Sequence, residues 1–168
     1  MYEQTVPVFR SMLTNLDTFL QKAAADADTR KFDVAVLLQS RLAPDQIPLL
    51  GQVQIACDVA KGCVARLSGK EVPKHEDTET TLPEVRERIA KTLAFIETAQ
   101  PGDFQNGASS KHTFPWMPGK YIESAPFVNQ VALPNFYFHV TTAYAILRHN
   151  GVVLGKADFL GKVDFKDL

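Results

Sequence analysis

The sequence predicts an all-α fold: a four-helix bundle with a short extended or β-hairpin excursion before its last helix. Four long segments of the 168-residue chain repeat apolar residues at three- and four-residue steps, the spacing of one buried helix face. One stretch, residues 103–124, breaks that period with glycines, prolines and aromatic residues. Amphipathic helices bury their apolar stripes against one another, which predicts a bundle. The long connections argue against a plain up-down-up-down arrangement.

The first half of the chain contains two long helices with a short one between them. The first is expected over residues 6–27, with an apolar stripe made of Val6, Phe9, Leu13, Leu16, Leu20 and Ala23. Residues 33–41 predict a shorter helix that is apolar on more than one face and therefore packs between larger elements. The second long helix starts at Pro44 or Asp45 and ends before Gly69. Its seam comprises Leu50, Val53, Cys57, Ala60, Val64 and Leu67.

A charged loop introduces the third long helix. Residues 71–80 are polar and charged, so we expect them at the surface, with His75 in solvent. Thr81 and Glu84 have the spacing of a capping box and mark the start of the helix. A Pro-Gly pair at residues 101–102 blocks its continuation. Its buried face comprises Leu82, Val85, Ile89, Leu93 and Ile96.

The excursion over residues 103–124 contains two glycine turn pairs, which favour a hairpin that crosses one end of the bundle. Trp116 is expected to anchor this excursion. Residues 124–133 form a partial helix or an irregular lead-in. The last long helix begins at Pro134 and stops at Gly151.

Length and composition narrow the class of protein. The chain suits a single helical-bundle domain over residues 1–168. Its 18 basic and 19 acidic residues argue against nucleic-acid binding, which needs a basic face. No apolar run is long enough for a membrane span and no signal peptide is visible, which predicts a cytoplasmic protein. Cys57 and Cys63 lie six residues apart, on different helix faces, so reduced thiols are expected, with Cys57 as a core packing residue.

Residues 135–161 combine aromatic residues, two histidines and an arginine with apolar surface. Ten residues separate His139 from His149, which leaves them about 80° apart around a helix and about 15 Å apart along its axis. One metal ion, with bonds of about 2.0–2.1 Å to nitrogen, cannot hold both. We therefore expect His139 in the middle of the bundle and His149 in the last helical turn, where a protonated imidazole meets the C-terminal dipole.

Two long motifs resemble a known family. They are RLAPDQIPLLGQVQIACDVAKGCVARLSG over residues 41–69 and LPNFYFHVTTAYAILRHNGVVLGKADFLG over residues 133–161. Both are similar to a bacterial and fungal family of uncharacterised proteins within the DinB/YfiT-like superfamily. The resemblance covers nearly the whole chain and implies a DinB/YfiT-like four-helix bundle. The close family has no established activity, so the resemblance implies no reaction.

Members of the wider superfamily are described as metal-dependent enzymes. Several of them catalyse transfer or hydrolysis reactions that use low-molecular-weight thiols. The typical site of the superfamily places three histidines around a divalent metal, one from the second helix and two from an HxxxH pair on the last. This sequence departs from that pattern: Ala143 follows His139 by four residues, and Ala145 precedes His149 by four. Gln54 and Asp58 stand in the region of the second helix where a histidine is expected. The matched positions therefore do not assemble three histidines.

One hypothesis is a degenerate pocket between the second and last long helices, made of Gln54, Asp58, His139, Thr142 and His149. Asp58 and His139 would bind a divalent metal such as Zn, Ni or Mn, or the carboxylate would orient the imidazole as a general base. The structural alternative is a buried Asp58–His139 hydrogen bond that fixes the register of the two helices.

A second hypothesis belongs to a different class, a non-catalytic bundle that forms a homodimer or binds a small apolar ligand. Phe136, Tyr137 and Phe138 are consecutive, so they cannot all face one core. At least one of these rings must meet another element, a partner chain or solvent.

Overall fold

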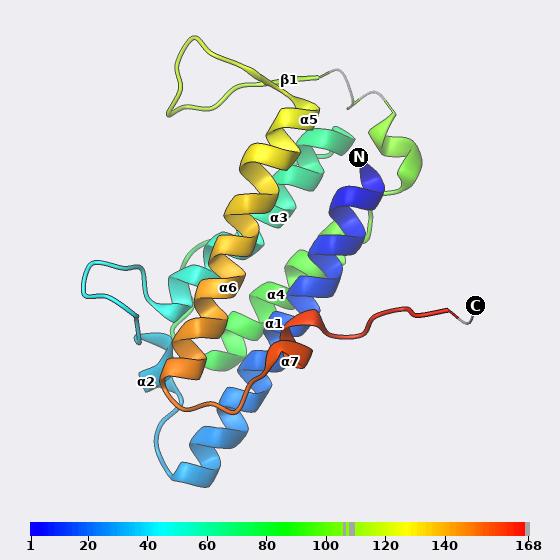
Figure 1. The fold of residues 1–168 in the computed structure, drawn as a ribbon. Coiled ribbons are helices and arrows are strands. Elements are labelled where there is room, and N and C mark those ends of the chain that lie inside the picture. Colours follow the sequence, from blue (N-terminus) through cyan, green and yellow to red (C-terminus); the bar gives the residue numbers. More distant parts are fainter. Residues whose placement is uncertain (106, 108–109, 167–168) are drawn as a thin grey trace.

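The computed structural model describes residues 1–105, 107 and 110–166. Its long helices are α1 (Tyr2–Arg30), α3 (Leu49–Ser68), α4 (Leu82–Ile96) and α6 (Leu133–His149), which pack in one bundle (Figure 1). The predicted four-helix bundle is therefore confirmed. The contacts of α3 are the most extensive, with α6 and with α4, so this helix links the two halves of the bundle.

The predicted apolar stripes form the core. Phe9 of α1 meets Phe136 of α6 edge to face, with ring centroids 4.8 Å apart. This aromatic geometry contributes about 0.5–1.5 kcal/mol beyond the burial of the two rings. The remaining core positions of α1 and α3 are sealed from solvent, among them Leu13, Leu16, Leu20, Val53, Cys57, Ala60 and Val64.

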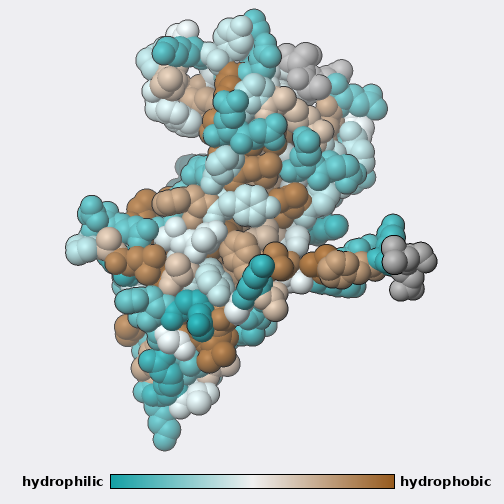
Figure 2. Space-filling view, in the orientation of Figure 1, coloured by the Kyte–Doolittle hydropathy of each residue, from teal (hydrophilic) through white to brown (hydrophobic). Residues whose placement is uncertain are grey.

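Proline determines where α3 begins. The predicted start at Pro44 or Asp45 is wrong, because α3 begins at Leu49 with Pro48 in an extended conformation at its N-cap. A proline pushes the residue before it away from the helical region, so the chain remains irregular until residue 48. The short helix predicted over residues 33–41 is reduced to α2 (Ala35–Leu38). The projecting loop between α2 and α3 exposes apolar side chains (Figure 2), notably Leu42 and Ile47.

The capping box at the start of α4 is confirmed. The backbone N–H of Thr81 donates to the Glu84 carboxylate at 2.9 Å, and the Glu84 N–H donates to the Thr81 hydroxyl. Hydrogen bonds from the backbone N–H groups of Thr80 and Thr81 hold the pKa of the Glu84 carboxyl at about 2, well below its usual value. The helix ends at Ile96, and a 3-10 turn, η1 (Pro101–Phe104), follows it.

The excursion is a short antiparallel hairpin. Its strands are β1 (Lys111–His112) and β2 (Ile122–Glu123), with Lys111 opposite Glu123 and His112 opposite Ile122. The hairpin loop extends over one end of the bundle (Figure 1). The predicted lead-in is helical throughout: α5 (Ser124–Pro126) runs into a π-helical turn, η3 (Phe127–Ala132), and then into α6.

The base of the hairpin is anchored by His112. Its Nε2 lies 2.8 Å from the Ser124 hydroxyl, and that hydroxyl also contacts the carbonyl oxygen of Gly107. Gly107 approaches the end of α3 so closely that a Cβ atom would lie 2.3 Å from the Leu67 carbonyl oxygen. The expectation that Trp116 anchors the excursion is wrong, since Trp116 is 67% exposed and stacks only on its neighbour Phe114 among the described residues.

The chain after α6 returns to α1. Gly151 leaves α6 with a φ of 93°, and α7 (Lys156–Leu160) then packs on α1. Asn15 donates to the carbonyl of Phe159 at 2.9 Å, and Lys22 pairs with Asp158 at 2.6 Å. Beyond α7 the described chain extends away from the bundle (Figures 1 and 2). None of the helices within the described ranges has the length and apolarity needed to cross a membrane.

Candidate functional site

His139 and Gln52 form a buried polar pair between α6 and α3. Nδ1 of His139 lies 2.7 Å from Oε1 of Gln52. The amide nitrogen of Gln52 donates to the carbonyl oxygen of Ile47 at 2.8 Å. A carbonyl can only accept, so the nitrogen of the amide must face Ile47 and its oxygen must face His139. The contact with the Ile47 carbonyl is therefore enough to fix the orientation of the Gln52 amide.

This orientation selects one tautomer of His139. The Gln52 oxygen is an acceptor, so Nδ1 of His139 must carry the proton that lies between them. In the neutral ring the lone pair is then on Nε2. Burial lowers the pKa of His139, which favours this neutral form at pH 7. The pair therefore holds a neutral imidazole with a defined acceptor nitrogen.

The second nitrogen of His139 reaches the surface. The His139 side chain is 7% exposed, yet within the described part of the chain Nε2 has no hydrogen-bond partner and is not sealed from solvent. The exposed ring of Phe138 lies edge-on to the imidazole, with centroids 5.2 Å apart. Thr142 lies one helical turn further, but its hydroxyl donates to the Phe138 carbonyl at 2.7 Å. Thr142 thus carries a hydroxyl whose proton is already engaged.

The predicted pairing of His139 with Asp58 is wrong, as a metal-binding pair and as a structural hydrogen bond. Asp58 binds Arg88 of α4 at 2.8 Å and Lys61 at 2.9 Å. Six residues separate Gln52 from Asp58, which places their side chains about 120° apart around α3. Gln52 consequently faces α6 while Asp58 faces α4.

Gln54 shares the α4-facing side with Asp58. Its amide donates to the Glu79 carboxylate at 2.9 Å. Gln54 therefore belongs to the ion network of Asp58 rather than to a pocket with His139. His149 lies exposed in the last turn of α6. The five candidate residues are thus divided between His139 with Thr142, Asp58 with Gln54, and His149 alone.

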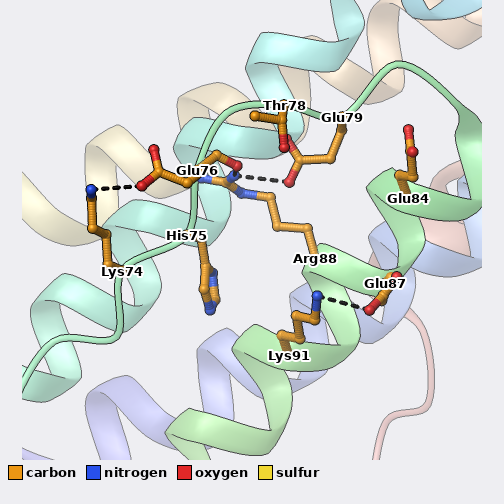
Figure 3. A pocket seen from close by; sticks show the side chains of 9 residues that line it. All are labelled: Lys74, His75, Glu76, Thr78, Glu79, Glu84, Glu87, Arg88 and Lys91. Carbon is orange, nitrogen blue, oxygen red and sulfur yellow. Dashed lines mark hydrogen bonds and ion pairs between the residues drawn. The ribbon is translucent and has the colours of Figure 1, made fainter.

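The ion network is centred on Arg88, which is 2% exposed. Its guanidinium binds Asp58 at 2.8 Å, Asp77 at 2.9 Å and Glu79 at 3.0 Å. Burial alone would raise the pKa of Glu79, but hydrogen bonds from Gln54 and Arg88 hold it below its usual value. The network ties the charged loop to α3 and α4 (Figure 3).

His75 lies beside this network and is half-buried, so the expectation that it is fully solvated is wrong. It lines a cavity of about 490 Å³ between the loop and α4 (Figure 3). Its Nδ1 is sealed from solvent without a hydrogen-bond partner among the described residues. Burial, together with the nearby Lys61 and Arg88 cations, lowers the pKa of His75. The loop therefore packs on the bundle through a neutral imidazole.

The three-histidine metal centre of the wider superfamily does not fit these residues. Nowhere within residues 1–105, 107 and 110–166 do three histidine, cysteine, aspartate or glutamate side chains come together as a metal-binding group. His139 has an amide as its neighbour, and the carboxylate of Asp58 is neutralised by two cations. The donor set for a Zn, Ni or Mn ion is therefore incomplete.

The cysteines offer no nucleophile. Cys57 and Cys63 are free thiols, both buried. Burial raises the pKa of each to about 12, so the reactive thiolate is not populated at neutral pH. The predicted role of Cys57 as a core packing residue agrees with its position at 0% exposure.

Gln52 and Arg88, the buried residues at the centre of the two networks, were not predicted from the sequence. Each of the two lies at a helical spacing from buried residues, which can be read from the sequence. Gln52 shares a stripe with Ala56 and Cys63, and Arg88 shares one with Val85 and Thr92. A polar side chain on a buried stripe needs a partner across the helix interface, so each position indicates a buried polar contact.

Comparisons with known proteins support one family. A family model described as a domain of unknown function, DUF1993, matches residues 1–160. The crystal structure of a DinB family member protein from Shewanella denitrificans is similar, with 50% sequence identity and a TM-score of 0.96. The match covers 99% of this chain and 95% of that one. No curated protein matches the chain. The chain therefore belongs to the DUF1993 family of domains of unknown function and is a DinB-like protein.

Proposed function

We propose that this protein performs acid–base chemistry on a small molecule, with His139 as the proton acceptor. The observation that carries the proposal is the hydrogen bond from Nδ1 of His139 to Gln52, which leaves Nε2 as an acceptor. A general base must be neutral at the working pH and must present a lone pair that a substrate can reach. His139 meets both requirements, because burial lowers its pKa and its Nε2 is not sealed among the described residues.

Gln52 supports this role as a positioning residue. In many imidazole sites a carboxylate holds Nδ1 and raises the pKa of the ring. An amide oxygen holds the same tautomer without adding a negative charge, so the ring remains a weak base that is unprotonated at pH 7. The proposal therefore assigns His139 to proton transfer from groups that are already acidic or activated, rather than to metal binding.

An activated ester tests this chemistry without knowledge of the natural substrate. The free lone pair of a neutral imidazole either activates water against p-nitrophenyl acetate or attacks the ester itself, so the wild-type protein should hydrolyse this ester about tenfold faster than His139→Gln. His149→Gln is the matched control, because His149 is exposed on the same helix and should leave the rate unchanged. The rate should rise with pH through a midpoint below 6.5, the ordinary pKa of histidine.

Two results would contradict the proposal. One is an equal rate in the wild-type protein and in a folded His139→Gln variant. The other is a rate that depends on His149 rather than on His139. Circular dichroism of each variant shows whether the bundle is intact, so a loss of activity through unfolding is recognised.

A further inference from the structure

A second cavity lies between the hairpin and the π-helical turn η3, away from the residues that surround His139. Its volume is about 270 Å³. Its walls are formed mainly by apolar and aromatic side chains: Phe114, Trp116, Met117, Tyr121, Ile122 and Val131. Small-molecule sites have this character, with apolar walls and a few placed polar groups. The volume is at the low end for such sites and suits a ligand with a single ring.

The floor of this cavity is fixed and its rim is exposed. Phe114 stacks on Trp116 with centroids 4.5 Å apart and lies 5.6 Å from the ring of the buried Phe127. On the rim, Trp116 is 67% exposed, Tyr121 56% and Met117 45%. Large apolar side chains gathered in water around one hollow are typical of a surface that binds a ligand.

The backbone beside the cavity is also unusual. Val131 comes from η3, where the chain makes π-helical hydrogen bonds between α5 and α6. π-Helical turns are rare and often occur at functional sites. The hydrogen bonds of the helix are thus rearranged at the position that faces the cavity.

His112 supplies a hydrogen-bond acceptor to the cavity. Its side chain is 6% exposed and lines the cavity from β1. The Ser124 hydroxyl donates its proton to backbone carbonyls, at Gly107 and Ser110, so its oxygen accepts from Nε2–H of His112. The neutral ring then has its lone pair on Nδ1. Within the described residues this nitrogen has no hydrogen-bond partner, and it is not sealed from solvent.

Lys120 supplies the charge. It is the charged side chain of the described lining, and it has no ion-pair partner in the part of the chain that the structure covers. Two further cations lie over aromatic rings nearby, Lys111 at 4.2 Å from the centroid of Tyr121 and Arg66 at 5.2 Å from that of Phe114. Lys120 therefore gives the cavity itself a positive charge, while Glu123 stands opposite Lys111 in the hairpin.

We propose that this cavity binds small aromatic carboxylates that also carry a ring hydroxyl or N–H group. The ring lies among the aromatic side chains, the carboxylate meets Lys120, and the ring donor bonds to Nδ1 of His112. The carboxylate and the ring donor make separate interactions, so compounds that lack one of these groups test each interaction in turn.

The test uses three matched compounds and the wild-type protein. 4-Hydroxyphenylacetate has all three features, phenylacetate lacks the hydroxyl, and p-cresol lacks the carboxylate. Isothermal titration calorimetry should give the lowest Kd for 4-hydroxyphenylacetate, and each of the other two should bind about tenfold more weakly. Trp116 is the single tryptophan of the chain, so its fluorescence should change in the same concentration range.

A lysine variant provides the second arm of the test. Lys120→Gln should weaken 4-hydroxyphenylacetate about tenfold and leave p-cresol unchanged, since only the carboxylate interaction is removed. Lys162→Gln is the control, an exposed lysine near the end of the chain. Absence of heat and of a fluorescence change with 4-hydroxyphenylacetate at millimolar concentration would overturn the proposal. Equal affinity of 4-hydroxyphenylacetate and either of the other two compounds, or an unchanged Kd for 4-hydroxyphenylacetate in folded Lys120→Gln, would overturn it as well.

Discussion

The amide oxygen of Gln52 lies 2.7 Å from Nδ1 of His139, although 87 residues separate them in the chain. This contact joins α3 to α6 and determines which nitrogen of the imidazole is available. Because Gln52 is held in turn by the Ile47 carbonyl, the loop before α3 contributes to the state of a residue on the last helix. A substitution of Gln52 should therefore change the protonation of His139, even where the residue at position 52 does not contact a ligand.

Gln52→Glu should raise the pKa of His139. A carboxylate 3 Å or so from the ring favours its protonated form, and such partners shift a pKa by about 1–3 units. The NMR titration of the His139 Cε1–H signal measures this change directly. The signal of His149, which is exposed in the last turn of the same helix, serves as the internal control and should not differ between the two proteins. An unchanged His139 titration in Gln52→Glu would show that the two side chains do not interact in solution.

Acid should destabilise the fold as the pH falls below about 6.5. The pKa values of His75, His112 and His139 are all lowered, mainly by burial. The unfolded chain, with ordinary values near 6.5, then binds protons more readily than the folded one. The stabilisation from neutral imidazoles is complete above about pH 6.5 and is lost as the pH falls through the folded-state values.

Thermal unfolding at a series of pH values tests this dependence. The Tm of the wild-type protein should be level above about pH 7 and fall below it, and His139→Gln should show a shallower fall. In His149→Gln, whose histidine is exposed, the slope should match that of the wild type. A steeper fall in His139→Gln would mean that the imidazole gains a stabilising partner on protonation.

The carboxylates around Arg88 should contribute unequally to stability. Glu79 is 11% exposed and Asp77 is 63% exposed, although their distances to Arg88 are 3.0 and 2.9 Å. Glu79→Ala removes a partner from a buried guanidinium and should cost about 2–4 kcal/mol of unfolding free energy. Asp77→Ala removes a solvent-screened pair and should cost less than about 1 kcal/mol. Urea denaturation of the two variants gives the comparison, and equal losses would argue that solvent screening is unimportant here.

Both thiols should be unreactive in the native protein. With pKa values raised to about 12 by burial, Cys57 and Cys63 should not react with Ellman's reagent at pH 8. In guanidinium chloride both of the two cysteines of the chain should react. Rapid reaction of either thiol without denaturant would show that α3 opens locally in solution.

Self-association stays a prediction. Tyr137 and Phe138 are 38% and 57% exposed on α6, as expected for consecutive aromatic residues that cannot share one core. If these rings meet a second copy of the chain, Phe138→Ser should lower the association constant measured by sedimentation equilibrium. A clean monomer across micromolar concentrations of the wild-type protein would remove the homodimer.

Local sequence signals predicted the secondary structure well where a residue type restricts the backbone directly. Thr81 with Glu84 marked the start of α4, because the capping box needs only four consecutive residues. The predicted start of α3 was wrong because both Pro44 and Pro48 are compatible with the beginning of a helix. The conformation of the residues between them decides the outcome, and Pro48 is the residue that directly precedes the helix.

The sequence by itself determined that His139 lies inside the bundle and His149 at a helix end, since a 3.6-residue period places side chains around one helix axis. It could not determine which neighbour His139 would meet. Gln52 and Asp58 were both available on α3, and they differ by about 120° around that helix. Only the packing of α3 between α6 and α4 decided that Gln52 meets the imidazole and Asp58 meets Arg88. Helical period is a local property, whereas the rotation of one helix against another depends on contacts throughout the core.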